Sequence, residues 1–195
     1  MSDADRKKWN QKYQDKPQLL ALRDASDVVK DYISDEKGLK ALDLACGTGR
    51  HAVYLAQKGY EVVAVDIAEA ALEALCINAE ANAVSEKITP KLMDLETHIF
   101  DVASYDLIVM TNFLDRALIQ ETKRSLKKGG LYIVETYMFD EENEKENSNA
   151  SNLLNAGELR EIFNDGFEEI YYGEYKNEDY ELYRMKKQVI VAQKV

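Results

Sequence analysis

Three aspartates close three short apolar runs, where their carboxylates can meet a ligand. Asp43 lies within the run Leu39–Ala45, Asp66 ends a second run 23 residues later, and Asp94 follows a third. A carboxylate accepts hydrogen bonds from hydroxyl and amino groups and attracts cations. The carboxyl ends of the strands in an open α/β sheet are where ligands bind. The three residues are therefore candidates for binding a ligand rich in hydroxyl, amino or cationic groups.

The segment Asp43–Arg50 connects the first apolar run to the first predicted helix. It reads Asp-Leu-Ala-Cys-Gly-Thr-Gly-Arg, and its small residues let the backbone approach a ligand, while helix-terminal N–H groups receive an anionic group. Gly47-x-Gly49-x-x-Ala52 also satisfies the loose dinucleotide fingerprint, which leaves an NAD(P)-dependent oxidoreductase open. Asp43 would repel a pyrophosphate, so it favours a ligand that carries an amine or a sulfonium.

The three acids together fit one ligand. We expect Asp66 to accept hydrogen bonds from both hydroxyls of a ribose, Asp94 to hold an adenine amino group, and Asp43 to face the cationic centre. S-adenosylmethionine contains all three groups. Arg50 is expected to meet its carboxylate, because a cation in the first turn of a helix otherwise opposes the helix dipole. The alternative is that these aspartates cap helices or balance surface charge.

Short apolar runs alternate with helical patterns along most of the chain. The runs predict strands over 39–45, 61–66, 88–93, 105–110 and 131–136, and the spacing predicts helices over 50–58, 68–82 and 115–128, with a short one near 159–163. Two final strands, 167–175 and 182–192, are joined by a connection over 176–179 that requires an antiparallel pair. We predict an α/β fold: a Rossmann-like, doubly wound, seven-stranded sheet with five parallel strands, a C-terminal antiparallel hairpin and helices on both faces.

Residues 1–195 are expected to form a single domain, with a helical cap over 1–38 and a Rossmann-like core over 39–195. Trp9 and Tyr13 are four residues apart and share one face of the first predicted helix. That face either packs against the core or closes as a lid over the ligand, where an aromatic ring attracts a sulfonium.

The composition excludes several classes of protein. The chain has 25 Lys and Arg against 36 Asp and Glu, a formal net charge of −11. That charge opposes binding to a nucleic-acid backbone, and no run approaches the ~20 apolar residues of a membrane span. The first residues lack a secretory signal, and Cys46 and Cys76 are too few for a disulfide framework or a metal cage, so we expect both to be buried packing residues. We expect a cytoplasmic monomer or homodimer, with no metal, nucleic-acid or membrane partner.

These motifs together resemble the class I S-adenosylmethionine-dependent methyltransferases. The resemblance extends over nearly the whole chain and is carried by residues 41–49, 65–67, 93–95, 105–109 and 126–130. Ala45 stands where the first motif more often has glycine, and Lys128 stands where proline is frequent before the fifth strand. The resemblance implies S-adenosyl-L-methionine as cofactor and S-adenosyl-L-homocysteine as product.

Within that family the chain is similar to the tellurite-resistance branch. The similarity is carried by residues 46–56 with Gly59-Tyr60, by Trp9–Tyr13, and by Asn112–Arg116 after the fourth strand. That branch includes methyltransferases that act on soft nucleophiles such as chalcogen oxyanions and thiols. The resemblance therefore implies a small-molecule methyl acceptor.

The motifs and strand ends give the candidate site residues. Those for the cofactor are Trp9, Tyr13, Asp43, Ala45, Cys46, Gly47, Gly49, Arg50, Asp66, Ile67, Asp94, Leu95 and Asn112. Those for the acceptor pocket are Tyr13, Asn112, Phe113, Arg116 and Tyr137, with Arg116 attracting an anion. No catalytic base is assigned, because alignment alone can lower the barrier by roughly 7–11 kcal/mol. His51 is expected to be a surface residue of its helix rather than a base.

Two alternatives to a methyltransferase stay open. The oxidoreductase leaves Asp43 and the terminal hairpin unexplained. The second alternative is a protein that binds S-adenosylmethionine but has lost catalysis, and such a protein keeps every donor-binding residue.

Overall fold

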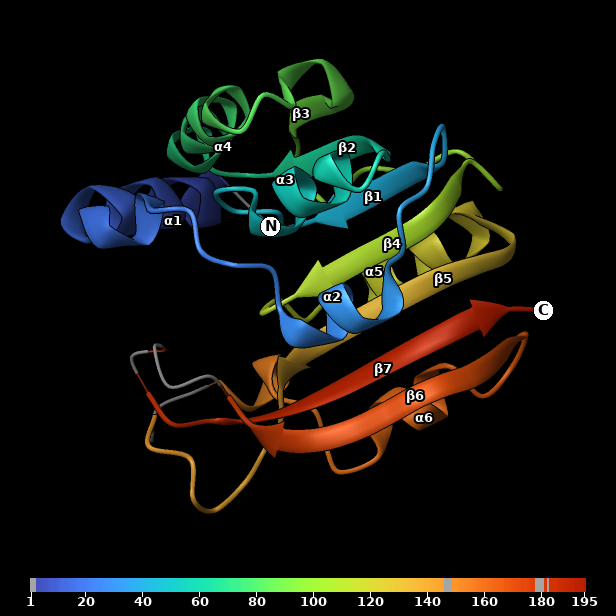
Figure 1. Cartoon of the computed structure of the whole chain (residues 1–195). Coiled ribbons are helices and arrows are strands. Elements are labelled where there is room, and N and C mark those ends of the chain that lie inside the picture. Colours follow the sequence, from blue (N-terminus) through green and yellow to red (C-terminus); the bar gives the residue numbers. More distant parts are fainter. Residues whose placement is uncertain (1–2, 146–148, 178–180, 182) are drawn as a thin grey trace.

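Parallel strands form the centre of the molecule. Their order in the sheet reverses once, because the first three strands of the chain extend the sheet in one direction and the next two extend it in the other. The computed structural model describes residues 3–145, 149–177, 181 and 183–195. The parallel strands are β1 (Lys40–Leu44), β2 (Glu61–Asp66), β3 (Ile88–Leu92), β4 (Tyr105–Thr111) and β5 (Leu126–Tyr137). Strands β6 (Phe167–Lys176) and β7 (Lys186–Lys194) are antiparallel to each other, and β7 is antiparallel to β5. The order β3-β2-β1-β4-β5-β7-β6 confirms the predicted sheet (Figure 1).

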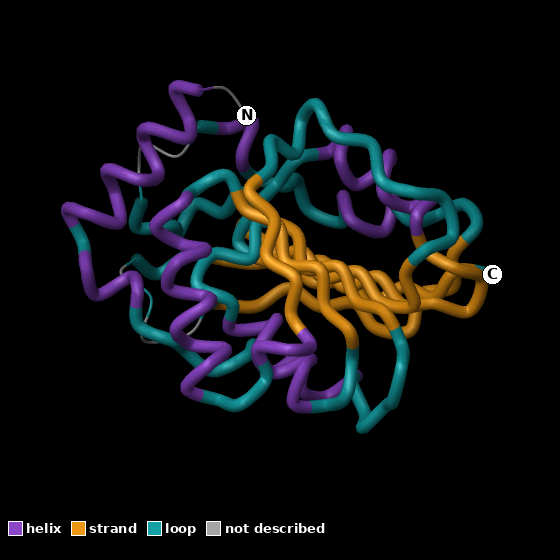
Figure 2. Tube along the Cα trace, turned by 90° about the horizontal axis from the view of Figure 1, so that it is seen from above, coloured by secondary structure: helices purple, strands orange, loops and turns teal. Residues whose placement is uncertain are grey.

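Helices cover both faces of this sheet, as Figure 2 shows. One face packs against α2 (Asp27–Tyr32), α3 (Arg50–Gln57) and α4 (Glu69–Ala81), and the other against α5 (Arg116–Thr122) and α6 (Glu158–Ile162). Helix α1 (Asp3–Asp15) lies beside α4 (Figure 1), and none of its described residues is buried. Short 3-10 helices are η1 (Pro17–Leu20), η2 (Ser85–Lys87), η3 (Lys123–Ser125) and η4 (Ala150–Asn152).

The central strands are buried on both faces. On β1, Ala41 contributes to the core under α2, α3 and α4, while Leu42 and Leu44 contribute to the core under α5 and α6. All three are 0% exposed. Strands covered on both sides read as continuous apolar runs, which is why the sequence predicted them. Because side chains alternate along a strand, Asp43 shares the face of Ala41.

The predicted boundary between the last long helix and the fifth strand is wrong. The helix expected over 115–128 ends at Thr122, and the chain passes through η3 before β5 begins at Leu126. Leu126 pairs with Tyr105, and the register shifts between Tyr105 and Leu107 before regular pairing resumes. The cause is this distant strand pairing, which overrides the helical propensity of the segment.

The predicted hairpin is antiparallel, as expected, but its connection is longer. Strand β7 begins at Lys186 rather than at residue 182, so residues 177–185 join the two strands. Asn177 closes this connection: its N–H donates to the carbonyl of Met185 over 2.8 Å, and its Oδ1 accepts from the Met185 N–H over 2.9 Å. Residues 178–180 and 182 of the predicted hairpin lie outside the described residues.

Two smaller expectations are refined. Among the described residues of the first 38, α1, η1 and α2 are helical and the segments between and after them are not. Cys46 is buried as expected, but Cys76 is exposed on α4.

Gly59→Ala is expected to lower the free energy of unfolding by about 2–5 kcal/mol. Gly59 ends α3 with φ +100, and a Cβ there would lie 2.0 Å from the carbonyl oxygen of Glu36. The left-handed conformation costs alanine about 1–2 kcal/mol, and the overlap with backbone adds roughly 1–3 kcal/mol. The control is Gly166→Ala, where φ is +72 but nothing lies within 4 Å, so only the conformational cost of about 1–2 kcal/mol applies. Urea unfolding compares the two, and equal losses would contradict this account.

Candidate functional site

The loop between β1 and α3 crosses the carboxyl edge of the sheet in a left-handed conformation. Ala45, Gly47 and Gly49 have φ values of +54, +54 and +85. Glycine suits position 45 better than alanine, because the left-handed conformation costs alanine about 1–2 kcal/mol of stability. Gly49 meets a second requirement, because a Cβ there would lie 2.0 Å from Cδ1 of Leu75 on α4. The loop therefore packs directly on α4.

Asp66, at the end of β2, holds this loop in place. Its Oδ2 accepts the N–H of Gly47 over 2.8 Å, and its Oδ1 accepts the N–H of Ala68 over 2.9 Å. Burial raises the pKa of Asp66, while these N–H groups act in the opposite direction. Each carboxylate oxygen can accept more than one hydrogen bond, so Asp66 anchors the loop and can still receive a ligand hydroxyl.

Asp43 lies on the neighbouring strand, on the side of α3. It is 1% exposed, and its Oδ2 has no hydrogen-bond partner in the described part of the chain. Burial raises the pKa of Asp43 to about 7, against the N–H of Ala52 and the charge of Arg50, which begins α3 and is itself buried. A buried carboxylate oxygen without a donor is unfavourable, so Asp43 suits the cationic or hydrogen-bond-donating group that the sequence predicted for it.

Helix α1 is attached to the start of α4 by polar contacts. The Oδ1 of Asn10 accepts the N–H of Ala70 over 3.1 Å, and its Nδ2 donates to Glu69. The Nε of Arg6 lies 3.3 Å from Oε1 of the same Glu69. The pairing of Asn10 with Glu69 was not predictable from the sequence, because no local pattern connects residues so far apart.

The aromatic face of α1 reaches the loop between β1 and α3. The hydroxyl of Tyr13 lies 3.4 Å from the position that a Cβ on Gly47 would occupy. Burial and the nearby charge of Asp66 raise the pKa of Tyr13. Trp9 lies behind Tyr13, with ring centroids 6.3 Å apart, and the Nζ of Lys12 is 4.0 Å from the Trp9 ring. Of the two predicted aromatic residues, Tyr13 is therefore the one that covers the loop.

Asp94 and Leu95 follow β3 at the same edge. The Oδ1 of Asp94 accepts the N–H of Glu96 over 3.0 Å and so caps a turn. Leu95 is buried at 2% exposed, and so is Ile67 at 5% after β2. The N–H of Met93 donates to the carbonyl of Asp66 over 3.0 Å, which keeps this segment beside the end of β2.

His51 is buried, so the expectation of a surface histidine is wrong. It is 2% exposed. Its Nε2 accepts the N–H of Ser26 over 3.2 Å, and its Nδ1 lies 3.3 Å from Oγ1 of Thr111. In a neutral ring whose Nε2 accepts, Nδ1 carries the proton and donates to Thr111. His51 thus joins the segment before α2 to the end of β4.

The predicted acceptor residues Asn112 and Tyr137 lie at the ends of adjacent strands. Asn112 follows β4 with φ +56, and its N–H donates to the carbonyl of Glu135 over 2.8 Å. Tyr137 ends β5 and donates its hydroxyl hydrogen to Glu181. Phe113 is partly buried and packs against the core under α5 and α6. The structure therefore brings Asn112 and Tyr137 to the same edge of the sheet as the loop between β1 and α3.

Arg116 is engaged in a structural pairing. Its Nε and Nη2 donate to the two carboxylate oxygens of Glu158 over 2.5 and 3.0 Å. Its Nη1 and Nη2 also donate to the carbonyls of Ser151 and Leu153 over 2.7 and 2.9 Å. The guanidinium joins the start of α5 to the segment before α6, and this arrangement gives no support to a role in attracting an anionic acceptor.

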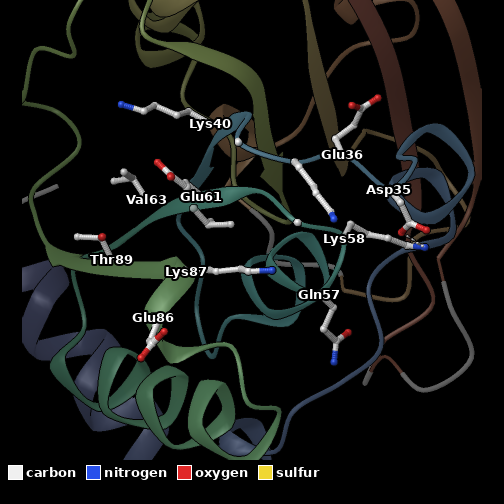
Figure 3. A pocket seen from close by; sticks show the side chains of 14 residues that line it. Asp35, Glu36, Lys40, Gln57, Lys58, Glu61, Val63, Glu86, Lys87 and Thr89 are labelled. Carbon is white, nitrogen blue, oxygen red and sulfur yellow. Dashed lines mark ion pairs between the residues drawn. The ribbon is translucent and has the colours of Figure 1, made fainter.

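A hollow of about 860 Å³ lies at the opposite edge of the sheet (Figure 3). Its lining comes from the first residues of β1, β2 and β3, including Lys40 and Glu61, and from the segment before β1, where Asp35 pairs with Lys58 of the α3 end at 3.0 Å. Ligands of open α/β sheets bind at the carboxyl ends of the strands. The candidate site is therefore the edge with Asp43 and Asp66, not this hollow.

Two further classes of site are absent from the described ranges. No group of three His, Cys, Asp or Glu side chains among them is arranged to hold a metal ion. None of the described helices has both the length and the apolar composition that crossing a bilayer requires. The polar atoms at the carboxyl edge thus remain the chemistry to explain.

Comparisons with known proteins point to methyltransferases. Residues 41–130 match a family described as a methyltransferase domain. The chain is 35% identical over 101 residues to ribosomal protein L11 methyltransferase of Campylobacter concisus (strain 13826), and 34% identical over 112 residues to the uncharacterized methyltransferase YbaJ of Bacillus subtilis (strain 168). These matches cover 51% and 55% of this chain but 35% and 44% of the relatives, so the chain spans less than half the length of either.

Solved structures share the fold. TehB from Haemophilus influenzae has a TM-score of 0.70 and 25% identity, with coverage of 87% of this chain and 60% of TehB. An S-adenosylmethionine-dependent methyltransferase from Methanosarcina mazei has a TM-score of 0.68 and 22% identity, with coverage of 89% and 99%. Residues 41–130 thus match a methyltransferase domain, and the strand order and these shared folds make the whole chain similar in fold to S-adenosylmethionine-dependent methyltransferases.

Proposed function

We propose that the protein transfers a methyl group from S-adenosylmethionine to a small molecule with a soft or anionic nucleophile, such as a thiol or a chalcogen oxyanion. The observation that carries the proposal is the pair of buried carboxylates, Asp43 and Asp66, on adjacent strand ends around a left-handed loop. The two lie next to the switch point between β1 and β4, where open α/β sheets bind ligands. The resemblance to the tellurite-resistance branch supports the small-molecule part of the proposal, and TehB shares the fold of this chain.

The residues of this edge suit the groups of the donor. Asp66 can accept the ribose hydroxyls, and the Oδ2 of Asp43, which has no partner within the described residues, can receive a donor group. Arg50 and the N–H groups at the start of α3 suit a carboxylate. Asp94, Leu95 and Ile67 are proposed for the adenine side, with Ala45, Cys46, Gly47 and Gly49 as the backbone cradle.

The chain's own part in the reaction is to bind, align and exclude water. When bound, S-adenosylmethionine supplies a methyl carbon on a sulfonium: the acceptor forms a new bond to this carbon while the donor C–S bond breaks and leaves its electron pair on the donor sulfur. A thiol acceptor reacts as the thiolate, its proton going to solvent. Alignment alone can contribute roughly 7–11 kcal/mol, so no base is required. His51, with both ring nitrogens engaged, is assigned a positioning role at the end of β4.

Residues 1–38 are proposed to act as the cap of the site. Tyr13 covers the backbone of Gly47, and α1 is attached to α4 through Asn10. A cover of this kind keeps water from the reacting atoms. Tyr13 would then border both the donor and the acceptor, with Asn112, Phe113 and Tyr137 on the acceptor side.

Two alternatives can be tested directly. A nicotinamide-dependent oxidoreductase would place a pyrophosphate against the buried carboxylate of Asp43, which is unfavourable. Calorimetric titration with S-adenosylmethionine and with NADH separates the two ligands. A binding protein without catalysis would bind the donor but form no S-adenosylhomocysteine with any of a panel of thiols and oxyanions. The absence of donor binding in a folded sample would reject the proposed function.

Asp66→Asn is expected to weaken S-adenosylmethionine binding about 30–100-fold. The loss of charge-assisted hydrogen bonds to a ligand is worth about 2–3 kcal/mol, and every 1.4 kcal/mol is about tenfold in Kd. Calorimetry measures the Kd, and thermal unfolding checks that the variant is folded. The matched control is Asp165→Asn, because Asp165 is exposed in the turn before β6. An affinity within twofold of the unchanged protein would remove Asp66 from the donor site.

Asp43→Asn is expected to stabilise the protein at pH 8 while it weakens donor binding. The pKa of Asp43 in the fold, about 7, lies above the ~3.9 of an unfolded aspartate. The folded state therefore binds this proton more tightly, and the contribution of Asp43 to the free energy of unfolding falls as the pH rises from about 4 to about 7. The variant lacks this decline. At pH 8 its free energy of unfolding should exceed that of the unchanged protein by up to a few kcal/mol, since one pKa unit is about 1.4 kcal/mol. Urea unfolding at pH 5 and pH 8 measures the free energy of unfolding of the unchanged protein and of the variant. If this energy changed equally in both proteins between the two pH values, the account would be contradicted.

Asn10→Ala is expected to weaken donor binding about 3–10-fold, because it removes a capping hydrogen bond to the start of α4 worth about 1 kcal/mol. The variant should also lose α1 more rapidly to limited proteolysis, and S-adenosylmethionine should protect it less. The control is Gln11→Ala, whose side chain donates to Asp15 within α1 over 2.8 Å. If both variants bind the donor as tightly as the unchanged protein, α1 is not a cover of the site.

A further inference from the structure

Lys187 is a buried cation at the edge where β5 and β7 meet. Its Nζ lies 3.1 Å from Oε1 of Glu135 and 2.6 Å from Oε1 of Glu181. Lys187 and Glu135 are 0% exposed. Tyr137, which pairs in register with Lys187, donates to Glu181, and its ring lies 5.4 Å from the ammonium. These four residues form the Lys187 cluster.

The Lys187 cluster adjoins the proposed acceptor pocket. Glu135 pairs in register with Thr111, the last residue of β4, and its carbonyl accepts the N–H of Asn112 over 2.8 Å. Asn112 and Tyr137 are themselves proposed pocket residues. Since the parallel strands end at one edge of the sheet, the cluster forms the wall of the pocket on the side of β5 and β7.

Two buried acceptor oxygens along this wall have no donor among the described residues. They are Oε2 of Glu135 and Oδ1 of Asn112. The other oxygens are engaged: Oε1 of Glu135 and Oε1 of Glu181 accept from Lys187, and Oε2 of Glu181 accepts from Tyr137 and, over 3.1 Å, from Asn177. Within the described part of the chain, two carboxylates therefore contact the ammonium of Lys187, while Arg116, after β4, donates to Glu158.

We propose that the methyl acceptor carries an ammonium group beside its nucleophile, and that Glu135 and Asn112 recognise this group. The class that fits is a small aminothiol, rather than a chalcogen oxyanion or an acidic thiol; this rests on the proposed function and narrows it. An ammonium brings a positive charge and three N–H donors, which the two oxygens lack. A surplus of buried carboxylate acts over several ångströms in a protein interior, so the wall disfavours an oxyanion even without direct contact.

The test compares three thiols of similar size: 2-aminoethanethiol, 2-mercaptoethanol and mercaptoacetate. Formation of S-adenosylhomocysteine is measured with the full chain and saturating S-adenosylmethionine, and rates are expressed per thiolate so that differences in thiol pKa do not enter. We expect kcat/KM to fall in the order ammonium, hydroxyl, carboxylate, with about tenfold or more between the extremes. Equal values, or a preference for mercaptoacetate, would overturn the proposal.

A binding measurement gives a second readout that does not depend on turnover. The S-methyl products of the three thiols are titrated calorimetrically into protein saturated with S-adenosylhomocysteine. The ammonium product is expected to bind about tenfold more tightly than the carboxylate product, and equal affinities would overturn the inference. Failure to bind S-adenosylmethionine marks failure of the proposed function, whereas donor binding with the opposite acceptor order marks failure of this inference alone.

Glu135→Gln keeps the shape of the side chain and removes its charge. The preference for the ammonium thiol over the carboxylate thiol should fall about tenfold, while the Kd for S-adenosylmethionine stays within about twofold. The matched control is Glu169→Gln on β6, which removes an exposed carboxylate paired with Arg160 at 2.7 Å. An equal effect of both variants would assign the preference to net charge rather than to the wall, and would overturn the assignment.

Discussion

The carboxylate of Asp66 is the anchor on which the rest of the site depends. One oxygen accepts from Gly47 after β1 and the other from Ala68 after β2, so the loops that follow two adjacent strands share a single attachment. The left-handed conformation of Ala45 is unfavourable for alanine on its own. Gly49 then brings the loop against Leu75 of α4. The sheet edge thereby fixes both the carboxylates and the N–H groups that a ligand would meet.

Along this edge lie several buried polar atoms that are removed from water and receive no hydrogen bond from a protein donor among the described residues. Within the described residues they include Oδ2 of Asp43, Oδ1 of Asn112 and Oε2 of Glu135, at the ends of β1, β4 and β5. Native proteins leave few such atoms, and each one lowers stability. The three strands are neighbours in the sheet, so these atoms follow a line from the donor loop to the Lys187 cluster. These three unfavourably buried oxygens thus lie along the path proposed for the methyl group, from S-adenosylmethionine to its acceptor.

Local patterns in the sequence predicted what local forces decide. The apolar runs predicted the strands, and the loop with Asp43 and Asp66 was predictable because it lies within one strand-helix-strand unit. The start of β5 was missed, because Leu126 becomes a strand residue only by pairing with distant Tyr105. The partners of Asn10, His51 and Lys187 were also missed. The contacts of Asn10 with Glu69, of His51 with Thr111 and of Lys187 with Glu135 join segments far apart in the chain, and no spacing or composition signals which buried polar groups will meet.

Helix α1 is held to the molecule differently from its neighbours. None of its described residues is buried, and its attachment to α4 includes the hydrogen bonds of Asn10 and the ion pair of Arg6 with Glu69. Helices α3 and α4 are fixed by apolar side chains instead. Counterions screen exposed charge pairs but leave apolar packing intact. We therefore expect ionic strength to act selectively on the attachment of this one helix. Under the proposed cap role, salt would change how often α1 covers the site and leave the loop between β1 and α3 unchanged.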